Sequence, residues 1–481
     1  MTAPFEFTRW MKPESAVLLL FVVILAWMPF PFGSNRPWAE LVAALGLGGV
    51  LLGWAGLVMS GVSPQTPLIR QIRWPALLTT LALAWGAFQS LDLEALKGLT
   101  GLDLQFLAHP VWRDAGEALG RDTASFISAD PATTRQALVA ALLPVMAFLL
   151  AYNLGRDRDR AALLLAAVVF IGMACAGMAS ASLALSIDLQ AIVLPEAGPL
   201  VDAFAAPFIN PDHLGAFLSL AAIAAFGASA ERFRQALPWD QDTRTILTGL
   251  GRSLEGKDGA LLILGLLLLA ALAATGSGVA IAGFLAGMAL LMLVLAHAPA
   301  EEEGHAAGRR AVTALLFAVT GLGVALGGAA LLGRFGPDAL DPPSRQLIAG
   351  AALQAIAAAP LGGQGFGAFE SYHTLSTGLS APGTVEEAGN DLLEPLSDLG
   401  LPAGIAFLAS PLLLVLQCAA GAATRRRDRV FPAIAVAAAT CMGVQAVAGF
   451  SLQVPAISVA FAVLLGIGTI QSWRTNMDLV R

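Results

Sequence analysis

Charged residues are scarce in this sequence. They make up 13% of its 481 residues, whereas soluble domains carry about 25%. Hydrophobic residues reach 57% and the mean hydropathy is +0.73, which is more apolar side chain than one soluble core buries. The composition therefore predicts an integral membrane protein. The net charge of −7 offers no basic surface of the kind that nucleic-acid binding needs, so no nucleic acid is expected as a partner.

Cysteine and histidine are also rare, with three and five residues. Cys175, Cys418 and Cys441 all lie in apolar runs, which offers no disulfide framework, and the histidines lack ligand spacing. We therefore expect no metal site and no cofactor. The polar residues 1–12 are followed by an apolar run without a small-residue cleavage site, so we interpret this run as a retained span.

Apolar runs of about 20 residues, the length that crosses a bilayer as a helix, recur along the chain. They predict an all-α, polytopic membrane protein with about twelve transmembrane helices. The predicted spans lie near 15–33, 38–60, 74–91, 136–154, 161–182, 212–230, 259–276, 279–297, 311–333, 399–421, 430–450 and 455–473. Acidic and basic residues are nearly absent from them, whereas ion-coupled transporters usually carry charges inside the membrane.

Lysine and arginine fall mostly on one side of this topology. If the N-terminus is cytoplasmic, the cytoplasmic segments hold most of the 27 Lys and Arg residues, which is a positive-inside pattern. An even number of spans then places both termini in the cytoplasm. The outer side has three long segments, 92–135, 183–211 and 334–398. We treat residues 1–481 as a single integral membrane domain and expect the last segment, with short helices, to hold the active site.

Three motifs in or beside these outer segments carry polar chemistry. In the first, F-I-N-P-D-H-L-G-A-F-L from Phe208 to Leu218, Asn210 or Asp212 can cap a helix that begins near His213. Unpaired N–H groups at such a helix end attract anions. The motif is either a phosphate or sugar site or an ordinary cap before a span.

The second motif combines a helix with a glycine run. Residues 344–358 are apolar at helical spacing, which predicts a helix at the outer membrane face with Arg345 near its start. Arg345 can bind a phosphate bidentately or pair with lipid headgroups. Arg334, at the end of a span, is a further cation, although span-end arginines commonly reach toward headgroups. The run that follows is interpreted as backbone that approaches a ligand closely, at Gly362, Gly363, Gly365 and Gly367.

The third motif, residues 385–404, is the most acidic outer stretch. Asn390 or Asp391 can cap a short helix that leads into the next span. One of its carboxylates can act as a general base, the alternative being a solvated acidic loop. The candidates are Glu386, Glu387, Asp391, Glu394 and Asp398.

In their order and topology, the motifs resemble the O-antigen ligase and O-antigen/exopolysaccharide polymerase superfamily (Wzy_C, WaaL-like). The similarity extends over nearly the whole chain, through Pro31–Trp38, Ile127–Leu138, Asn210–Phe217, Ser344–Arg345, Gly363–Phe369 and Ala388–Leu393. It implies glycan transfer from a polyprenyl pyrophosphate-linked oligosaccharide at the periplasmic face of the bacterial inner membrane. The implied partners are this glycan lipid, the bilayer and other polysaccharide assembly proteins.

The resemblance also assigns roles to residues. It makes Arg345 the leading pyrophosphate ligand, because charge builds on the leaving group as the bond breaks. It implies a substrate site lined by Asn210, His213 and Asn390, and we expect Arg334 and Asp391 to bind substrate with them.

Two family residues are replaced in this chain. The histidine of the family motif A-H-N-D is Gly389, and an arginine of its S-R-G motif is Gly278. His373 or Glu387 is expected to supply the base instead. We therefore favour a membrane glycosyltransferase, a polysaccharide polymerase more than a ligase. The alternatives are an inactive relative that binds the lipid-linked glycan or scaffolds the assembly machinery, and, third, a flippase or transporter.

Overall fold

The computed structural model describes residues 13–63, 70–120, 123–185, 204–236, 257–296, 343–377, 390–425 and 428–473. Within these ranges the regular elements are all helices, which confirms the predicted all-α class. The α-helices are α1 (Pro13–Trp27), α2 (Pro37–Met59), α3 (Arg73–Gln89), α4 (Leu93–Thr100), α5 (Pro110–Leu119), α6 (Pro131–Leu154), α7 (Arg158–Leu185), α9 (Pro211–Ala236), α11 (Lys257–Thr275), α12 (Gly278–Ala296), α15 (Pro343–Ala358), α16 (Phe369–Thr377), α17 (Leu393–Thr424), α18 (Val430–Ala448) and α19 (Pro455–Gln471). Short 3-10 turns are η2 (Phe32–Ser34), η4 (Gln105–Leu107) and η6 (Ser451–Gln453).

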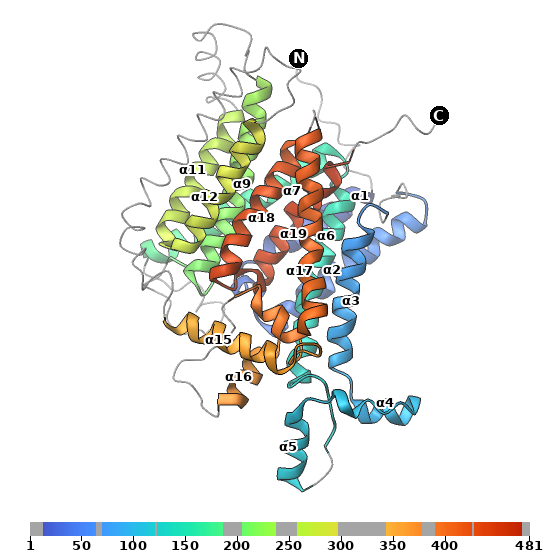
Figure 1. The fold of residues 1–481 in the computed structure, drawn as a ribbon. Coiled ribbons are helices and arrows are strands. Elements are labelled where there is room, and N and C mark those ends of the chain that lie inside the picture. Colours follow the sequence, from blue (N-terminus) through green and yellow to red (C-terminus); the bar gives the residue numbers. More distant parts are fainter. Residues whose placement is uncertain are drawn as a thin grey trace.

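Most of these helices form one bundle of apolar spans (Figure 1). In the described part of the chain, α2, α6, α7, α9, α12, α17 and α18 are long and apolar enough to cross a membrane, and α3 with α4 adds an eighth span if the two, bent by 98°, are one. The shorter apolar helices include α1, α19 and the apolar part of α11. Every predicted span except 311–333, which lies outside the described residues, coincides with a helix. The chain is therefore a polytopic membrane protein, and the number of twelve spans stays a prediction.

Helix α9 forms the centre of the bundle. Its apolar window is 94% buried, because α9 packs between α7, α11, α12, α18 and α19. A helix that is apolar on all sides lies either inside a protein or against lipid, and α9 lies inside the bundle. Small residues let neighbouring backbones approach closely. A methyl group added at Gly172 would lie 2.5 Å from Ala221 Cβ of α9, and one at Gly287 would lie 2.6 Å from the Ala437 carbonyl oxygen.

Polar contacts define one end of the bundle, which we call the arginine end. There Arg158 pairs with Asp428 at 2.9 Å, and Arg160 pairs with Glu14 at the start of α1. Gln471, at the end of α19, donates to the carbonyl oxygens of Gly155 and Arg156. The starts of α1, α7 and α18 and the ends of α6 and α19 therefore lie together.

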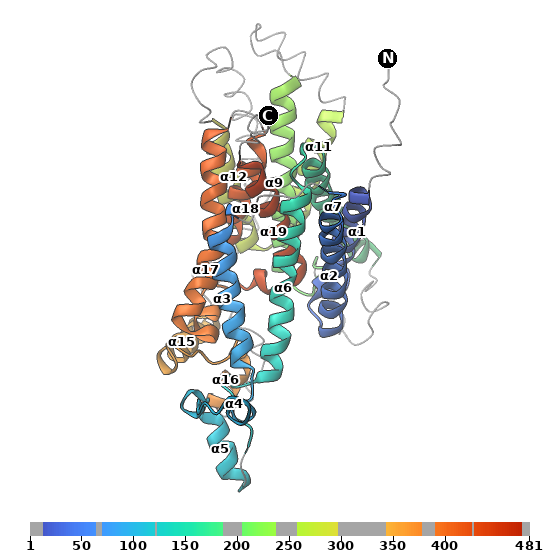
Figure 2. The same ribbon diagram turned by 90° about the vertical axis from the view of Figure 1, so that its right-hand side faces the viewer.

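The opposite end of the bundle, which we call the loop end, carries the short helices. Helix α15 lies crosswise there, with α16 below it, and α4 and α5 project farthest from the bundle (Figures 1 and 2). These helices belong to the predicted outer segments 92–135 and 334–398. The described helices of these two segments thus lie at the end that is opposite the arginine cluster.

Helices α3 and α17 form a pair at the side of the bundle (Figure 2). Ser410 Oγ is 2.7 Å from Thr79 Oγ1 and donates to the Pro75 carbonyl oxygen at 2.9 Å. Toward the loop end, α17 breaks at Gly400, whose φ of 76° and ψ of 164° are not helical. The predicted span 399–421 begins at this break, and the preceding turns, from Leu393, belong to the loop end.

Candidate substrate site at the loop end

The first candidate motif folds as a capped helix start. Asn210 Oδ1 accepts a hydrogen bond from Asp212 N at 2.8 Å, and the Asn210 carbonyl oxygen accepts from His213 N at 3.1 Å. Asn210 is therefore a cap of α9, as its residue type and position predict. The Asn210 side chain also fixes the direction in which the first turn of α9, with His213, points.

His213 connects this turn to the segment between α18 and α19. Its side chain is buried, and its ring lies edge-on to the ring of Phe450 with 4.9 Å between the centroids. Phe450 directly precedes η6, the short turn that leads into α19. The start of α9 and the 449–453 connection are therefore neighbours.

The third motif contacts the same connection. Asn390 Oδ1 accepts from Leu392 N and Leu393 N, at 2.9 and 3.1 Å, so Asn390 caps the start of α17. Asn390 Nδ2 donates to the Val447 carbonyl oxygen at 3.1 Å. The amide side chain thus joins α17 to the end of α18.

Asp391 is held more tightly still. Its backbone N–H lies between the carbonyl oxygens of Ala446 and Gly449, at 3.1 and 3.2 Å, and its Oδ2 accepts from Leu452 N at 3.0 Å. The other carboxyl oxygen, Oδ1, is buried and has no hydrogen-bond partner. Burial, with a smaller contribution from the charge of Glu394, raises the pKa of Asp391 well above its ordinary range, against the hydrogen bond from Leu452. This side chain has an unused oxygen and a raised proton affinity.

Asn210, His213, Asn390 and Asp391 therefore gather around the 449–453 connection, although they lie far apart in the sequence. Phe450, Leu452 and Gln453 complete the group: Gln453 Nε2 donates to Glu394 Oε2 at 2.6 Å. The sequence motifs gave no signal for these three residues, since they lie in a short link between two spans.

Three glycines of the second motif, Gly363, Gly365 and Gly367, pack against the protein itself, whereas a methyl group at Gly362 would meet no described atom closer than 4.0 Å and the expected approach of Gly362 to a ligand stays a prediction. A methyl group at Gly363 would lie 2.1 Å from the Asp398 carbonyl oxygen, and one at Gly365 would lie 2.1 Å from Ser128 Oγ. Gly367 N donates to Asp398 Oδ2 at 2.6 Å. Gly363, Gly365 and Gly367 all have positive φ. These glycines let the backbone fit against the protein itself, at the break in α17.

Two buried glutamines hold this glycine segment in place. Gln89, at the end of α3, donates to the carbonyl oxygens of Gly362 and Asp398 at 2.7 and 2.8 Å. Gln364 Nε2 donates to the Ala355 carbonyl oxygen of α15 at 2.8 Å, and Gln364 Oε1 is 2.9 Å from His109 Nε2. We call Gln89, Gln364, Asp398 and His109 the glutamine network. It joins α3, α5, α15 and α17, and sequence reasoning missed it apart from Asp398.

The predicted helix 344–358 forms as α15 and places Arg345 in its first turn. The contacts of the Arg345 side chain lie outside the described residues, as do Arg334, Glu387 and Gly389 altogether. Helix α15 is fixed through the glutamine network and through Ala352 and Ala355, which pack against Phe369 of α16. The backbone that carries Arg345 is thus fixed at the loop end of the bundle.

His373 lies on α16, where its ring stacks on Phe369 with 6.0 Å between the centroids. The same helix lines a cleft of about 510 Å³ together with Trp112 and Asp130, and both polar and apolar side chains face it. Ser371 Oγ donates to Asp130 Oδ2 at 3.0 Å. Burial alone would raise the pKa of Asp130, but the hydrogen bonds from Thr133, Ser371 and Ala132 outweigh it and lower the pKa.

Gly278 begins α12 at the loop end. A methyl group there would meet no heavy atom within 4 Å, whereas one at Gly215 in the first turns of α9 would lie 3.3 Å from Ser277 Cβ. The position of the missing family arginine is therefore open and adjoins the start of α9.

The fold and these contacts define a helical membrane protein in which Asn210, His213, Asn390 and Asp391 lie together at the loop end of the bundle. A family model described as O-Antigen ligase (Wzy_C) matches residues 263–408. This match confirms the predicted resemblance to the O-antigen ligase and polymerase superfamily, over a region that holds α12, α15, α16 and the broken start of α17. No curated protein matches the chain.

Proposed function

We propose that the protein transfers a glycan from polyprenyl pyrophosphate to an acceptor sugar at the periplasmic face of the inner membrane, as a polysaccharide polymerase or O-antigen ligase-like enzyme. The observation that carries the proposal is the convergence of Asn210 and His213 with Asn390 and Asp391 around the 449–453 connection. The family match to residues 263–408 supports the class of reaction.

The distribution of charge supports the proposed orientation. The arginine end gathers Arg156, Arg158, Arg160 and Arg425 at the ends of spans, which is the pattern of a cytoplasmic face. The loop end, with α4, α5, α15 and α16, is then periplasmic. Both termini are cytoplasmic in this proposal.

In the proposed reaction, the acceptor hydroxyl oxygen bonds to the anomeric carbon of the glycan. The bond from that carbon to the phosphate oxygen breaks, and the electron pair leaves with polyprenyl pyrophosphate. Arg345, with Arg334, stabilises the negative charge that develops on this leaving group. The hydroxyl proton passes to a carboxylate or imidazole base.

Of the candidates that the structure describes, Asp391 is the base that the geometry favours over His373, and Glu387, outside the described residues, stays the alternative. Asp391 Oδ1 has no partner to give up, and its raised pKa makes the carboxylate a stronger proton acceptor than an exposed aspartate. Asp391 is also the last residue of the A-G-N-D sequence, two positions after Gly389, which stands where the family has its histidine.

The test is transfer by the purified protein in lipid nanodiscs, measured as release of polyprenyl pyrophosphate from a lipid-linked oligosaccharide. Asp391→Asn keeps the acceptor for Leu452 N but removes the base, so we expect kcat to fall by about 10²- to 10⁴-fold. The matched control is Asp92→Asn, because Asp92 caps α4 at the same end and asparagine caps equally well. Retention of activity in Asp391→Asn within threefold would exclude Asp391 as the base.

The alternative, an inactive relative that binds the glycan lipid or scaffolds the assembly machinery, makes a different prediction. Deletion of the gene would then block surface glycan assembly, while Arg345→Ala, Asp391→Asn, His373→Ala and Glu387→Gln would all leave it intact. If the protein is instead a flippase, the deletion strain should lack lipid-linked repeats in the outer leaflet of its inner membrane.

A further inference from the structure

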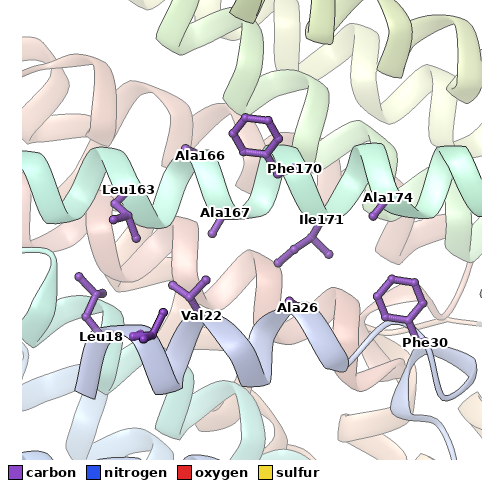
Figure 3. A pocket seen from close by; sticks show the side chains of 11 residues that line it. Leu18, Val22, Ala26, Phe30, Leu163, Ala166, Ala167, Phe170, Ile171 and Ala174 are labelled. Carbon is purple, nitrogen blue, oxygen red and sulfur yellow. The ribbon is translucent and has the colours of Figure 1, made fainter. Parts of the chain in front are cut away.

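An apolar groove runs along the surface between α1 and α7 (Figure 3). It has a volume of about 530 Å³, and each of its lining side chains is apolar. Ala26 on α1 and Ala174 on α7 lie between the larger Phe30 and Phe170, and Ala166 lines the groove beyond Phe170 (Figure 3). The groove is therefore walled by one helix on each side, which suits a single hydrocarbon chain.

The groove follows α1 and α7 from the arginine end toward the loop end. Arg160 and Glu14 join the starts of α1 and α7 at the arginine end, and both helices run from there toward the loop end. From Leu163 to Ala174 on α7 the groove extends over about 16 Å at 1.5 Å per residue, which is about half of the hydrocarbon thickness of about 30 Å. A chain lying in it would enter from the outer leaflet.

Two tryptophans lie at the end of the groove that faces the loop end of the bundle, which we call the mouth of the groove. Trp27 and Trp38, at the end of α1 and the start of α2, lie edge-to-face with 6.3 Å between the ring centroids. Tryptophan is enriched at the level of the lipid headgroups, and Phe30 lies between these two residues in the chain. The headgroup of a lipid whose chain fills the groove would therefore lie at this turn.

The turn at the mouth of the groove, residues 32–34, has a strained backbone conformation. Phe32, Gly33 and Ser34 have φ values of 55°, 71° and 60°, and such runs persist only where surrounding contacts fix them. Ser34 Oγ donates to the Met28 carbonyl oxygen at 2.7 Å. Arg36 is exposed, forms no ion pair with the described residues, and lies 5.6 Å from the centroid of the Phe32 ring.

The same turn packs against the candidate site. A methyl group at Gly33 would lie 2.6 Å from Val454 Cγ1 and 2.7 Å from Phe208 Cε1. Phe208 is two residues before Asn210, and Val454 directly follows the 449–453 connection. The mouth of the groove, the cation Arg36 and the candidate site therefore adjoin one another.

We propose that the α1–α7 groove holds the isoprenoid chain of the polyprenyl pyrophosphate donor, and that Arg36 binds its diphosphate as it passes to the site. This inference rests on the proposed function for the identity of the lipid. A diphosphate is a strong partner for a guanidinium group, and the continuity with the site gives the headgroup a destination that a structural phospholipid does not need.

The test is photo-crosslinking of a diazirine-tagged polyprenyl pyrophosphate to the full-length protein in phosphatidylcholine nanodiscs. Ala166→Phe and Ala174→Phe fill the groove from α7. The matched control is Ala162→Phe, at an exposed alanine of α7 that does not line the groove. We expect the groove variants to lose at least 80% of the crosslink to α1 and α7 and to raise the KM for donor at least tenfold, with kcat unchanged, and the control to change neither value more than twofold.

Competition identifies the occupant. Excess untagged polyprenyl pyrophosphate should displace the crosslink, while phosphatidylglycerol should not, and Arg36→Gln should weaken binding of the pyrophosphate more than that of uncharged polyprenol. Equal displacement by phosphatidylglycerol, or an unchanged KM in both groove variants, overturns the inference. Because crosslinking needs no turnover, a wild-type protein that binds donor in the groove but transfers no glycan refutes the proposed function alone.

Discussion

The substitution Gln364→Ala tests whether the glutamine network fixes the position of α15. Gln364 is 1% exposed, and its side chain joins the Ala355 carbonyl oxygen to His109 Nε2. The Gln364 backbone carbonyl oxygen accepts a hydrogen bond from Ala129 N, and the Gln364 backbone N–H donates to the Ser397 carbonyl oxygen. Both backbone hydrogen bonds would remain in the variant. The substitution therefore removes two side-chain hydrogen bonds and leaves the backbone path intact.

The expected cost follows from these two bonds. The hydrogen bond to the Ala355 carbonyl oxygen contributes about 1 kcal/mol, and loss of the other bond, which leaves the half-buried His109 donor unpaired, costs about 1–3 kcal/mol. Because Gln364 is the side chain that ties α15 to the network, we expect a loss of about 2–4 kcal/mol in the local stability of α15. One factor of ten corresponds to about 1.4 kcal/mol, so amide exchange should accelerate about 30- to 1,000-fold.

Hydrogen–deuterium exchange of peptides from residues 349–358 measures this change. The matched control is Gln105→Ala, because the Gln105 side chain donates to Glu94 in an exposed pair. This variant should change the amide exchange rate of residues 349–358 by less than about threefold. Because α15 carries Arg345, the same variant should raise the KM for the lipid-linked donor. Exchange in Gln364→Ala that stays within threefold of wild type would show that α15 is fixed by other contacts.

Three further predictions concern neighbouring elements. Burial, despite the hydrogen bond to Gln364, lowers the pKa of His109 below its ordinary 6.5, and its Nδ1 caps α5 by accepting from Val111 N. The folded state thus favours the neutral ring, so the contribution of His109 to folding stability is complete above about pH 6.5 and falls as the pH drops further. Amide hydrogen exchange of residues 110–119 should therefore rise at pH 5 in wild type but not in His109→Gln. Gly365→Ala, at φ +112° and with Ser128 Oγ 2.1 Å from the new methyl, should lower the thermal unfolding temperature, whereas Gly98→Ala, with open space, should not. Gly278→Arg should leave that temperature unchanged and lower the KM for donor, and a KM equal to or above wild type would refute a pyrophosphate site there.

Local sequence patterns determined the helices and their caps. The apolar runs are long enough to cross a bilayer, and backbone groups in lipid must pair within the segment, so helices follow from the sequence. Asn210 and Asn390 accept bonds from N–H groups two or three residues away, and such contacts can be read from neighbouring residue types. The short family motifs were also sufficient for the resemblance that the match to residues 263–408 confirms.

Long-range contacts decided the rest. The glycine run was interpreted as backbone that approaches a ligand, but Gly363, Gly365 and Gly367 fit against Asp398, Ser128 and Ala137. A local sequence pattern does not indicate which atoms a glycine will contact. Gln89 and Gln364 join segments more than 250 residues apart, and Asp391 finds its donor at Leu452. The sequence determined which side chains the loop end would contain, because composition and capping act locally. Only the tertiary structure decided which of them meet, because helix packing in three dimensions sets those distances.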